Sequence, residues 1–242
     1  MLRTMTIARR EFFAFFNSAI AYIVLCVFLL AVGILFFIMS GFFITNEATM
    51  RGFFNSFHHP MFPVLPLFAA AVTMRLIAEE KRQGTFEILM TLPVREAEIV
   101  LGKYLASLVF LAVVLLITLG YPITISFASD LDWGPIFGGY VGLLLLGGAY
   151  LAIGLLASSI TEHQIIAFFS AVVISFFFYY VNYAGAFLPA SLSSFVQYLS
   201  FTYHFGNLAR GVIDSRDVLY LASVIAACLM GAVLSLKARK WR

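Results

Sequence analysis

Charged residues are scarce in this chain. Asp, Glu, Lys and Arg make up 11% of its 242 residues, whereas 62% are hydrophobic. A soluble domain carries about 25% charged and about 45–50% apolar residues. A fold in water could not bury so much apolar surface, so the composition excludes a soluble domain and indicates an integral membrane protein. The cations sit at the ends of apolar runs and form no continuous stripe, so a nucleic acid is not an expected partner.

The chain also lacks the residues that several kinds of chemistry require. Its two cysteines, Cys26 and Cys228, fall inside apolar runs and read as small buried hydrophobes. No Gly-x-x-x-x-Gly-Lys-Ser/Thr phosphate loop occurs, because the segment from Leu101 to Tyr104 lacks both the leading glycine and the hydroxyl residue. We therefore expect no ATP hydrolysis by this chain, and if it pumps a substrate the energy comes from elsewhere.

Catalytic and metal sites are not expected either. Glu79 and Glu80 superficially fit an intramembrane protease of the Glu-Glu-x-x-x-Arg type, but the arginine position is Gly84. The adjacent His58 and His59 have no further metal ligands in view. The centres of the apolar runs carry essentially no ionisable residue, which argues against a proton-coupled carrier or a cation channel.

What the chain has in abundance is long apolar runs. A helix that spans a membrane needs about 20 mostly apolar residues. Candidate spans lie at about 20–43, 61–77, 105–129, 135–158, 165–188 and 218–236. The second run is the weakest, because it is short and rich in proline at its start, so a re-entrant segment is the alternative for it. The sequence predicts an all-α integral membrane protein with six transmembrane helices in a single domain, 1–242.

The distribution of charge predicts the orientation. Cytoplasmic loops collect Lys and Arg. With six spans and the N-terminus inside, all 15 Lys and Arg residues lie on the inner side except Arg51, Arg210 and Arg216. Omitting the second span would invert everything after it and destroy this asymmetry. We therefore expect a multi-pass membrane protein with both termini in the cytoplasm, and we take the bacterial inner (plasma) membrane as its expected location.

Residues 1–19 have the pattern of an amphipathic helix at the membrane interface. Met5, Ala8, Phe12 and Phe15 recur at helical spacing. Such a helix can lie along the inner leaflet before the first span. A plain extension of the first span is the alternative.

Residues 78–104 form the only substantial inner loop. Gly84 permits a break in the backbone, Thr85 can cap a new helix, and Pro93 ends it. Phe86, Leu89 and Met90 then share one face. We expect a short amphipathic helix outside the membrane whose apolar face needs lipid headgroups or a protein groove as its partner. A second helix is expected to start near Arg95 and to run into the third span.

Two other regions carry polar or irregular features. The segment 189–217 is expected to form surface helices or a re-entrant hairpin at the outer side. Mildly polar side chains occur within the third and fifth spans, and they fit either helix packing and an aromatic belt or the lining of a translocation path. The path candidates are Thr118, Tyr121, Tyr179, Asn182 and Tyr183.

The inner loop resembles ABC-2-type transporter permeases. The matching residues are Glu79, Glu80, Lys81, Arg82, Gly84, Thr85, Glu87, Leu89, Thr91, Pro93 and Val94, followed by 98–103. The stretch 203–205 with 210–217 is similar to the gliding-motility-associated (GldF-like) branch, and the nitrous-oxide-reductase maturation (NosY-like) branch comes next. The resemblance covers essentially the full length.

The resemblance implies a permease subunit, with an exporter as the usual case, that is driven by a separate ATPase. The loop after the second span would be the coupling helix that docks into the ATPase, and the turn between the fourth and fifth spans would be the second contact. The implied contact residues are Glu79, Glu80, Arg82, Gly84, Thr85, Phe86, Glu87, Leu89, Met90, Thr91, Pro93, Glu162 and His163.

The implied complex holds two permeases, identical or different, and two ATPases that bind ATP and Mg, with no cofactor in this chain. The substrate path would run between the permeases near spans two and five. An accessory periplasmic or membrane protein is a further implied partner. A membrane scaffold that recruits a different cytoplasmic partner is the competing interpretation, and the two differ in whether an ATPase accompanies the chain.

Overall fold

The computed structural model describes residues 2–39, 53–54, 64–86, 94–127, 131–187 and 189–239. These residues form helices and connecting turns with no strand among them. The sequence-based prediction of an all-α protein is confirmed for this part of the chain.

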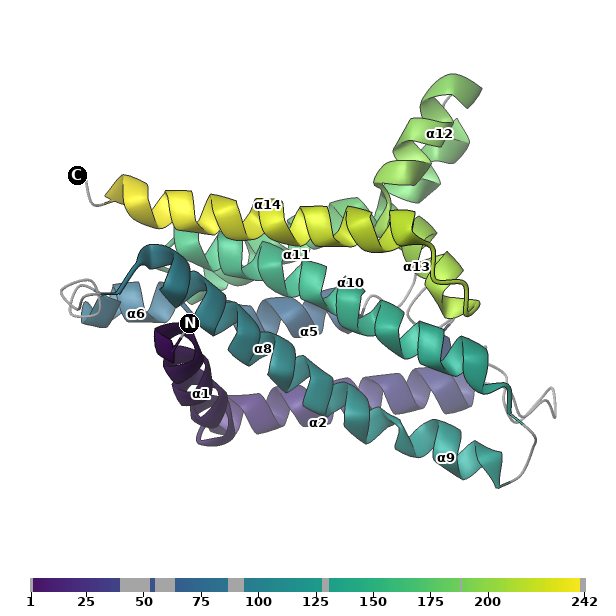
Figure 1. Ribbon diagram of the computed structural model, residues 1–242, viewed down its shortest axis with the longest axis horizontal. Helices are drawn as coiled ribbons and strands as arrows, with labels where there is room; N and C mark the ends of the chain where they lie inside the picture. Colours follow the sequence, from purple (N-terminus) through teal and green to yellow (C-terminus); the bar gives the residue numbers. More distant parts are fainter. Residues whose placement is uncertain are drawn as a thin grey trace.

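Long helices lie side by side along the long axis of the molecule (Figure 1). Within the described residues, five helical segments are long and apolar enough to cross a membrane. They are Ala19–Phe37 (α2, Ala19–Ile34, with the π-helical turn Leu35–Met39), Glu96–Ser126 (α8, Glu96–Thr118, then α9, Gly120–Ser126), Trp133–Ile160 (α10), Gln164–Ala184 (α11) and Ser215–Ala238 (within α14, Ser215–Arg239). Each corresponds to one of the predicted spans, and the ends differ by several residues.

The weak second run is represented by α5, Val64–Thr73, which continues through a turn into α6, Ala78–Arg82. α5 packs against α2, α10 and α11, and most of its side chains are buried. It contains too few residues to count as a span by itself, and the start of the run lies outside the described residues. The sixth span therefore stays a prediction.

α10 is the central helix of the bundle. It packs against α5, α8, α11, α13 and α14. Small residues permit close approach: a Cβ added at Gly154 would lie 2.0 Å from Thr73 Oγ1, and one at Gly147 would lie 2.4 Å from Leu111 Cδ2. Helices in a bilayer gain no hydrophobic free energy by associating, so their association depends on close van der Waals packing, which small residues permit. The glycines of α10 thus allow α5 and α8 to pack directly on its backbone.

One short helix, α1 (Leu2–Phe16), lies across the end of the bundle and packs on α8 (Figure 1). Its buried side chains, Ala8 and Phe15, belong to the predicted apolar face, whereas Met5 from that face is 68% exposed. Gly102 of α8 makes the contact possible, because a Cβ there would lie 3.1 Å from the Thr4 carbonyl oxygen.

The opposite end carries a helical hairpin. A 3₁₀ turn, Gly185–Phe187, ends α11, and α12 (Ala190–Leu199) and α13 (Phe201–Ala209) follow. α12 projects sideways from the long helices, while α13 packs on α10 (Figure 1).

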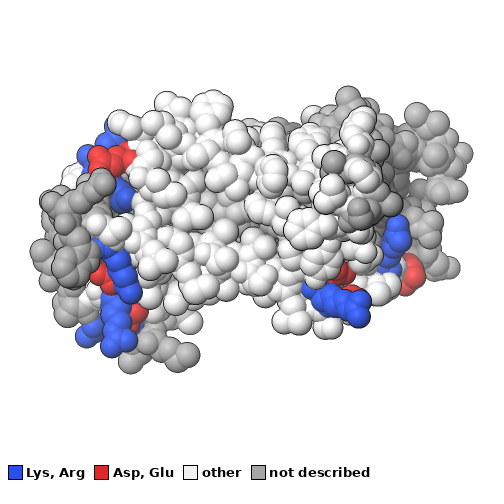
Figure 2. All heavy atoms as spheres, turned by 90° about the horizontal axis from the view of Figure 1, so that it is seen from above, with Lys and Arg blue, Asp and Glu red and all other residues white. Residues whose placement is uncertain are grey.

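Charge is confined to the two ends of the molecule on the face that Figure 2 shows, with an uncharged surface between them. We call the end with α6 and the turn between α10 and α11 the α6 end. The other, with α12 and α13, is the α13 end. Burying a charge in hydrocarbon is costly, so this distribution suits a bundle whose middle lies in a bilayer.

Candidate functional site

The first predicted contact segment begins with the single turn of α6. Glu79 and Arg82 form a bidentate pair on its surface, with Arg82 Nη2 2.7 Å and Nε 2.9 Å from the two Glu79 carboxylate oxygens. Gly84 then reverses the chain with a φ of 71°, a left-handed conformation that favours glycine. The Thr85 hydroxyl donates a hydrogen bond to the Glu80 carbonyl oxygen at 3.3 Å, which closes the turn. The break predicted at Gly84 is therefore present.

The second predicted contact segment is the turn between α10 and α11. Glu162 and His163 are both exposed there. The His163 backbone N–H donates to Thr161 Oγ1 at 3.1 Å, and α11 begins at the next residue, Gln164. This turn therefore presents its polar side chains outward from the α6 end.

The two segments are joined directly. The Gln164 side-chain amide donates to the Glu79 carboxylate, and Lys81 Nζ donates to the Ser159 carbonyl oxygen. The Ser158 hydroxyl accepts from the backbone N–H groups of Ile77 and Ala78 at 3.2 and 3.0 Å. Segments about 80 residues apart in sequence thus form one continuous surface.

A surface pocket lies between these two segments. Among the described residues, its lining comes from both of them and includes Arg82, His163, Gln164 and Ile165. The pocket combines a guanidinium, an imidazole and an amide with one apolar side chain. A partner protein that enters it would therefore touch both segments at once.

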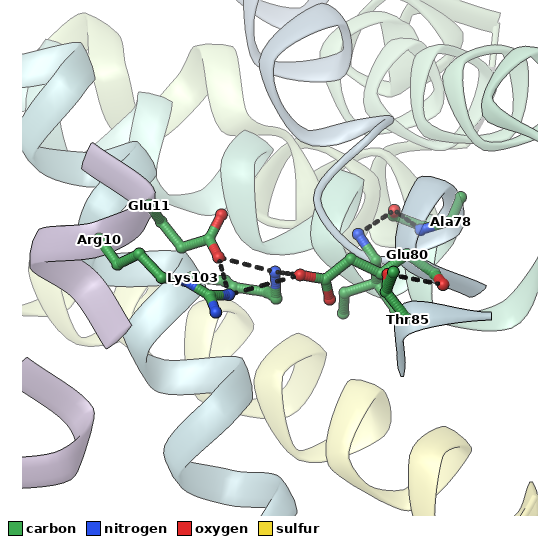
Figure 3. A network of polar contacts seen from close by, with 8 residues as sticks. Arg10, Glu11, Ala78, Glu80, Thr85 and Lys103 are labelled. Carbon is green, nitrogen blue, oxygen red and sulfur yellow. Dashed lines mark hydrogen bonds and ion pairs between the residues drawn. The ribbon is translucent and has the colours of Figure 1, made fainter. Parts of the chain in front are cut away.

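Beneath this surface lies an ion cluster built around Lys103 of α8 (Figure 3). The Lys103 side chain is 1% exposed, and its Nζ lies 2.8 Å from Glu80 Oε1 and 3.2 Å from Glu11 Oε1. Arg10 Nη2 lies 2.7 Å from Glu11 Oε1 and 3.6 Å from Glu80 Oε1. A buried ammonium needs such partners, because transferring an unpaired charge from water into a protein interior costs on the order of several kcal/mol. The cluster ties α1, α6 and α8 together.

Electrostatics lower the pKa of the Glu11 carboxyl. Burial acts to raise the pKa of Glu11, but the positive charges of Lys103 and Arg10 outweigh it, and the net pKa is lowered. The hydrogen bond to Glu11 raises the pKa of Arg10 in turn. At neutral pH Glu11 and Arg10 therefore carry opposite charges in contact.

The Glu79 carboxyl supports a prediction about pH. Its hydrogen bond with Arg82 is the main cause that lowers its pKa from 4.5 to about 2. A carboxyl whose pKa is lowered by folding stabilises the protein at pH values above its ordinary pKa of 4.5. This contribution is lost as the pH falls toward about 2. Glu79→Gln should therefore destabilise the protein at neutral pH, and its difference from wild type should shrink over this acid range in thermal unfolding.

Arg82→Gln provides the matched control for that prediction. This variant removes the main cause of the lowered Glu79 pKa and leaves the Glu79 carboxyl in place. Its stability should therefore also lose the dependence on acid pH that the wild-type protein shows. An unchanged gap between wild type and Glu79→Gln from neutral to acid pH would contradict the assignment.

Some of the residues that organise this end were missed by sequence reasoning. Glu11 and Ser158 lie outside the predicted contact segments, whereas Lys103 lies in the predicted coupling loop and Gln164 in the predicted second contact turn without being assigned these bonds. Lys103 had a usable signal: a lysine that lies several residues inside an apolar helix requires a buried partner. The identity of that partner had no local signal, because Glu11 is 92 residues away in sequence.

The remaining predicted contact residues divide into two groups. Phe86 is 5% exposed and packs in the chain's own core. The expectation that its ring belongs to an exposed apolar face is thus corrected, because the turn at Gly84 directs it back into the bundle. Five predicted residues lie outside the described part of the chain: Glu87, Leu89, Met90, Thr91 and Pro93.

The candidate path residues do not come together within this chain. Thr118 is buried, donates to the Leu115 carbonyl oxygen at 2.7 Å, and lies 3.2 Å from the Tyr140 hydroxyl. Tyr121 packs against the rings of Phe36 and Phe37.

The other path candidates lie on α11, which packs on a different part of α10. Tyr179 is buried, Asn182 is half-buried and Tyr183 is 39% exposed. That these side chains line a translocation path remains a prediction.

The described residues hold no group of three or more His, Cys, Asp or Glu side chains that could bind a metal ion, and both cysteines are free. The long apolar helices, with charge confined to the two ends on the face that Figure 2 shows, define a polytopic α-helical membrane protein. The chain belongs to the ABC-2 family of transporters, because it matches the family described as ABC-2 family transporter protein over residues 5–238. It is a membrane permease component of an ABC transporter. A search of the curated proteins gives no match.

Proposed function

We propose that this permease draws its energy from a separate ATPase that docks at the α6 end, on the surface formed by residues 79–85 and 162–165. The observation that carries the proposal is the bond between Glu79 and Gln164, which joins the two predicted contact segments into one surface. Arg82 and His163 are exposed at that surface, on either side of the shared pocket. The ATPase would bind ATP and Mg, and this chain would hold no cofactor.

The hydrogen bonds of the α6 end suggest how movement of the ATPase would reach the spans. A shift of α6 would be felt by α8 through the contact of Glu80 with Lys103, and by α10 through Ser158. Gln164 would carry the same shift to α11. Because these contacts are buried or join several helices at once, the spans would move as packed units between inward-open and outward-open states.

The assembly that we propose has two permeases and two ATPases in the inner membrane of a bacterium, with both termini in the cytoplasm and six spans per permease. The asymmetry of Lys and Arg supports the orientation. α11 offers an exposed apolar face that includes Phe169, Val173 and Phe177, which suits contact with lipid or with a second permease. Thr118, Tyr121, Tyr179, Asn182 and Tyr183 are the proposed path residues.

The finer assignment rests on sequence alone. We propose an exporter of the gliding-motility-associated branch, on the strength of residues 203–205 and 210–217, with an accessory periplasmic or membrane protein as a further partner.

The docking proposal is tested with Arg82→Glu. Its side chain is 59% exposed, so the change should leave the bundle folded while it places two carboxylates, those of residues 79 and 82, on the docking surface. We expect recovery of the ATPase with the purified permease to fall at least ~10-fold, which corresponds to about 1.4 kcal/mol of binding free energy. Co-purification of the ATPase from membranes is the measurement.

Arg216→Glu is the matched control. It makes the same exchange at an exposed position of the opposite, α13 end and should leave ATPase recovery unchanged. Equal loss in both variants would contradict docking at the α6 end. If no nucleotide-hydrolysing protein accompanies even the wild-type chain, the scaffold interpretation replaces this proposal.

A further inference from the structure

His204 is the most completely enclosed titratable side chain at the α13 end. It belongs to α13, its side chain is 0% exposed, and both of its ring nitrogens are bonded. Nδ1 lies 2.6 Å from Asp217 Oδ1 in the first turn of α14. Nε2 lies 2.8 Å from the Tyr198 carbonyl oxygen in the last turn of α12. The ring therefore connects the hairpin helices α12 and α13 with α14.

These two contacts fix where the protons must be. A carbonyl oxygen only accepts hydrogen bonds, so Nε2 must carry a proton. Nδ1 and a carboxylate oxygen at 2.6 Å also need a proton between them, because two unprotonated acceptors would repel each other at that distance. The His204–Asp217 pair is thus complete only when it holds one proton in addition to the Nε2 proton.

The surroundings favour an imidazolium paired with a carboxylate. Asp217 lies in the first turn of α14, where the helix dipole stabilises a negative charge. Its second oxygen accepts from Asn207 Nδ2 at 3.0 Å. The Tyr220 ring stacks on His204 at 4.1 Å between centroids and 21° between planes, and stacking on an aromatic face suits a cation.

Other titratable groups near the ring are phenols. Tyr198 of α12 and Tyr203 of α13 contact it edge-on, and Tyr220 comes from α14. Among the described residues, no Lys or Arg lies within ion-pair distance of Asp217. His204 is therefore the cation that balances the Asp217 charge within the part of the chain that is described.

We propose that His204 and Asp217 form a buried proton-binding site that latches the α12–α13 hairpin to α14. Loss of the shared proton would leave an uncompensated carboxylate in a dry site and would remove the bond that holds the two side chains. Burying such a charge is strongly unfavourable, so the end of α12 would separate from α14 and let water reach Asp217, while α13 stays packed on α10 through Phe201, Phe205 and Leu208. The end of α12 also contacts α14 through Tyr220, whose hydroxyl donates to the Leu199 carbonyl oxygen at 2.7 Å and whose ring packs against Tyr198.

The sign of the pH dependence follows from linkage. The closed hairpin binds the shared proton more tightly than the open hairpin does. Closure is therefore favoured at acid pH and lost as the pH rises. The ligand of this site is a proton, and its binding determines the position of α12.

A spin-label distance measurement tests the latch on the full chain in lipid nanodiscs. Labels are placed on Ser194→Cys of α12 and Ser223→Cys of α14, which are both exposed, after Cys26→Ser and Cys228→Ala remove the native thiols. We expect one short distance in acid buffer at about pH 6, and a second, longer distance that grows reversibly in alkaline buffer at about pH 9. A single unchanged distance at both pH values would overturn the proposal.

Asp217→Asn separates the proton from the geometry. Its amide nitrogen can donate to a neutral Nδ1 while its oxygen still accepts from Asn207, so the latch would no longer need the shared proton. We expect this variant to stay closed at both pH values. Asp214→Asn is the matched control, because Asp214 lies three residues earlier and caps only the Arg216 N–H at 2.9 Å, and it should open like wild type. A pH response that survives Asp217→Asn, or disappears in Asp214→Asn, would overturn the proposal.

A second measurement needs no variant. Nitrogen NMR of ¹⁵N-histidine-labelled protein in lipid, at neutral pH, should show His204 with a proton on Nε2 and a strongly hydrogen-bonded proton shared by Nδ1. An Nδ1 signal of the bare, unprotonated type for His204 would contradict the site even if every variant folded poorly.

Discussion

Lys103→Met should unfold the α6 end of the permease. Methionine keeps much of the volume of the lysine stem but removes the ammonium that lies between Glu11 and Glu80. These carboxylates are only 13% and 21% exposed, so they would face each other with the 58% exposed Arg10 side chain as the cation that still contacts both. Removing one partner of a buried pair costs about 3–5 kcal/mol, and we expect a loss of that size in the free energy of unfolding, measured by denaturant titration in detergent micelles.

Two further variants define the cause of that loss. Lys237→Met removes a cation from an exposed position of α14 and should leave stability within about 0.5 kcal/mol of wild type. Glu11→Gln and Glu80→Gln combined with Lys103→Met should restore part of the lost stability, because the facing charges are gone. If Lys103→Met were as stable as Lys237→Met, the ion cluster would have no structural role.

Phe86→Asp is the second change with a large expected effect. The ring is 5% exposed and packs in the main core, so the variant loses the buried aromatic contacts and places a carboxylate there without a partner. Phe→Ala changes in cores cost about 3–5 kcal/mol, and the buried charge adds to that cost. We expect lower thermal stability in detergent together with loss of ATPase co-purification.

Phe86→Leu separates the two parts of that expectation. Leucine keeps an apolar side chain in the core, so both stability and ATPase association should be largely retained. If Phe86→Asp lost the ATPase without losing stability, the ring would act by direct contact with the partner, and its anchoring role would be wrong.

Sequence reasoning succeeded where the signal is local. Apolar runs located the five long helices, because a helix in lipid satisfies its own backbone and must be apolar over the bilayer thickness. The positive φ at Gly84 and the start of α8 at Glu96, directly after Arg95, also follow from residues next to each other in the chain. The burial of Phe86 was not foreseen, because it depends on the direction in which the turn at Gly84 sends the chain.

The sequence by itself determined the class of the protein, the positions of its long helices and the segments proposed to meet the ATPase. Only the tertiary structure decided that Glu79 bonds with Gln164, that Lys103 holds Glu11 and Glu80, and that His204 holds Asp217. The physical reason is that hydropathy and helical periodicity report the environment of neighbouring residues. A buried ion pair instead joins residues from different helices, and its partners are fixed by how those helices pack.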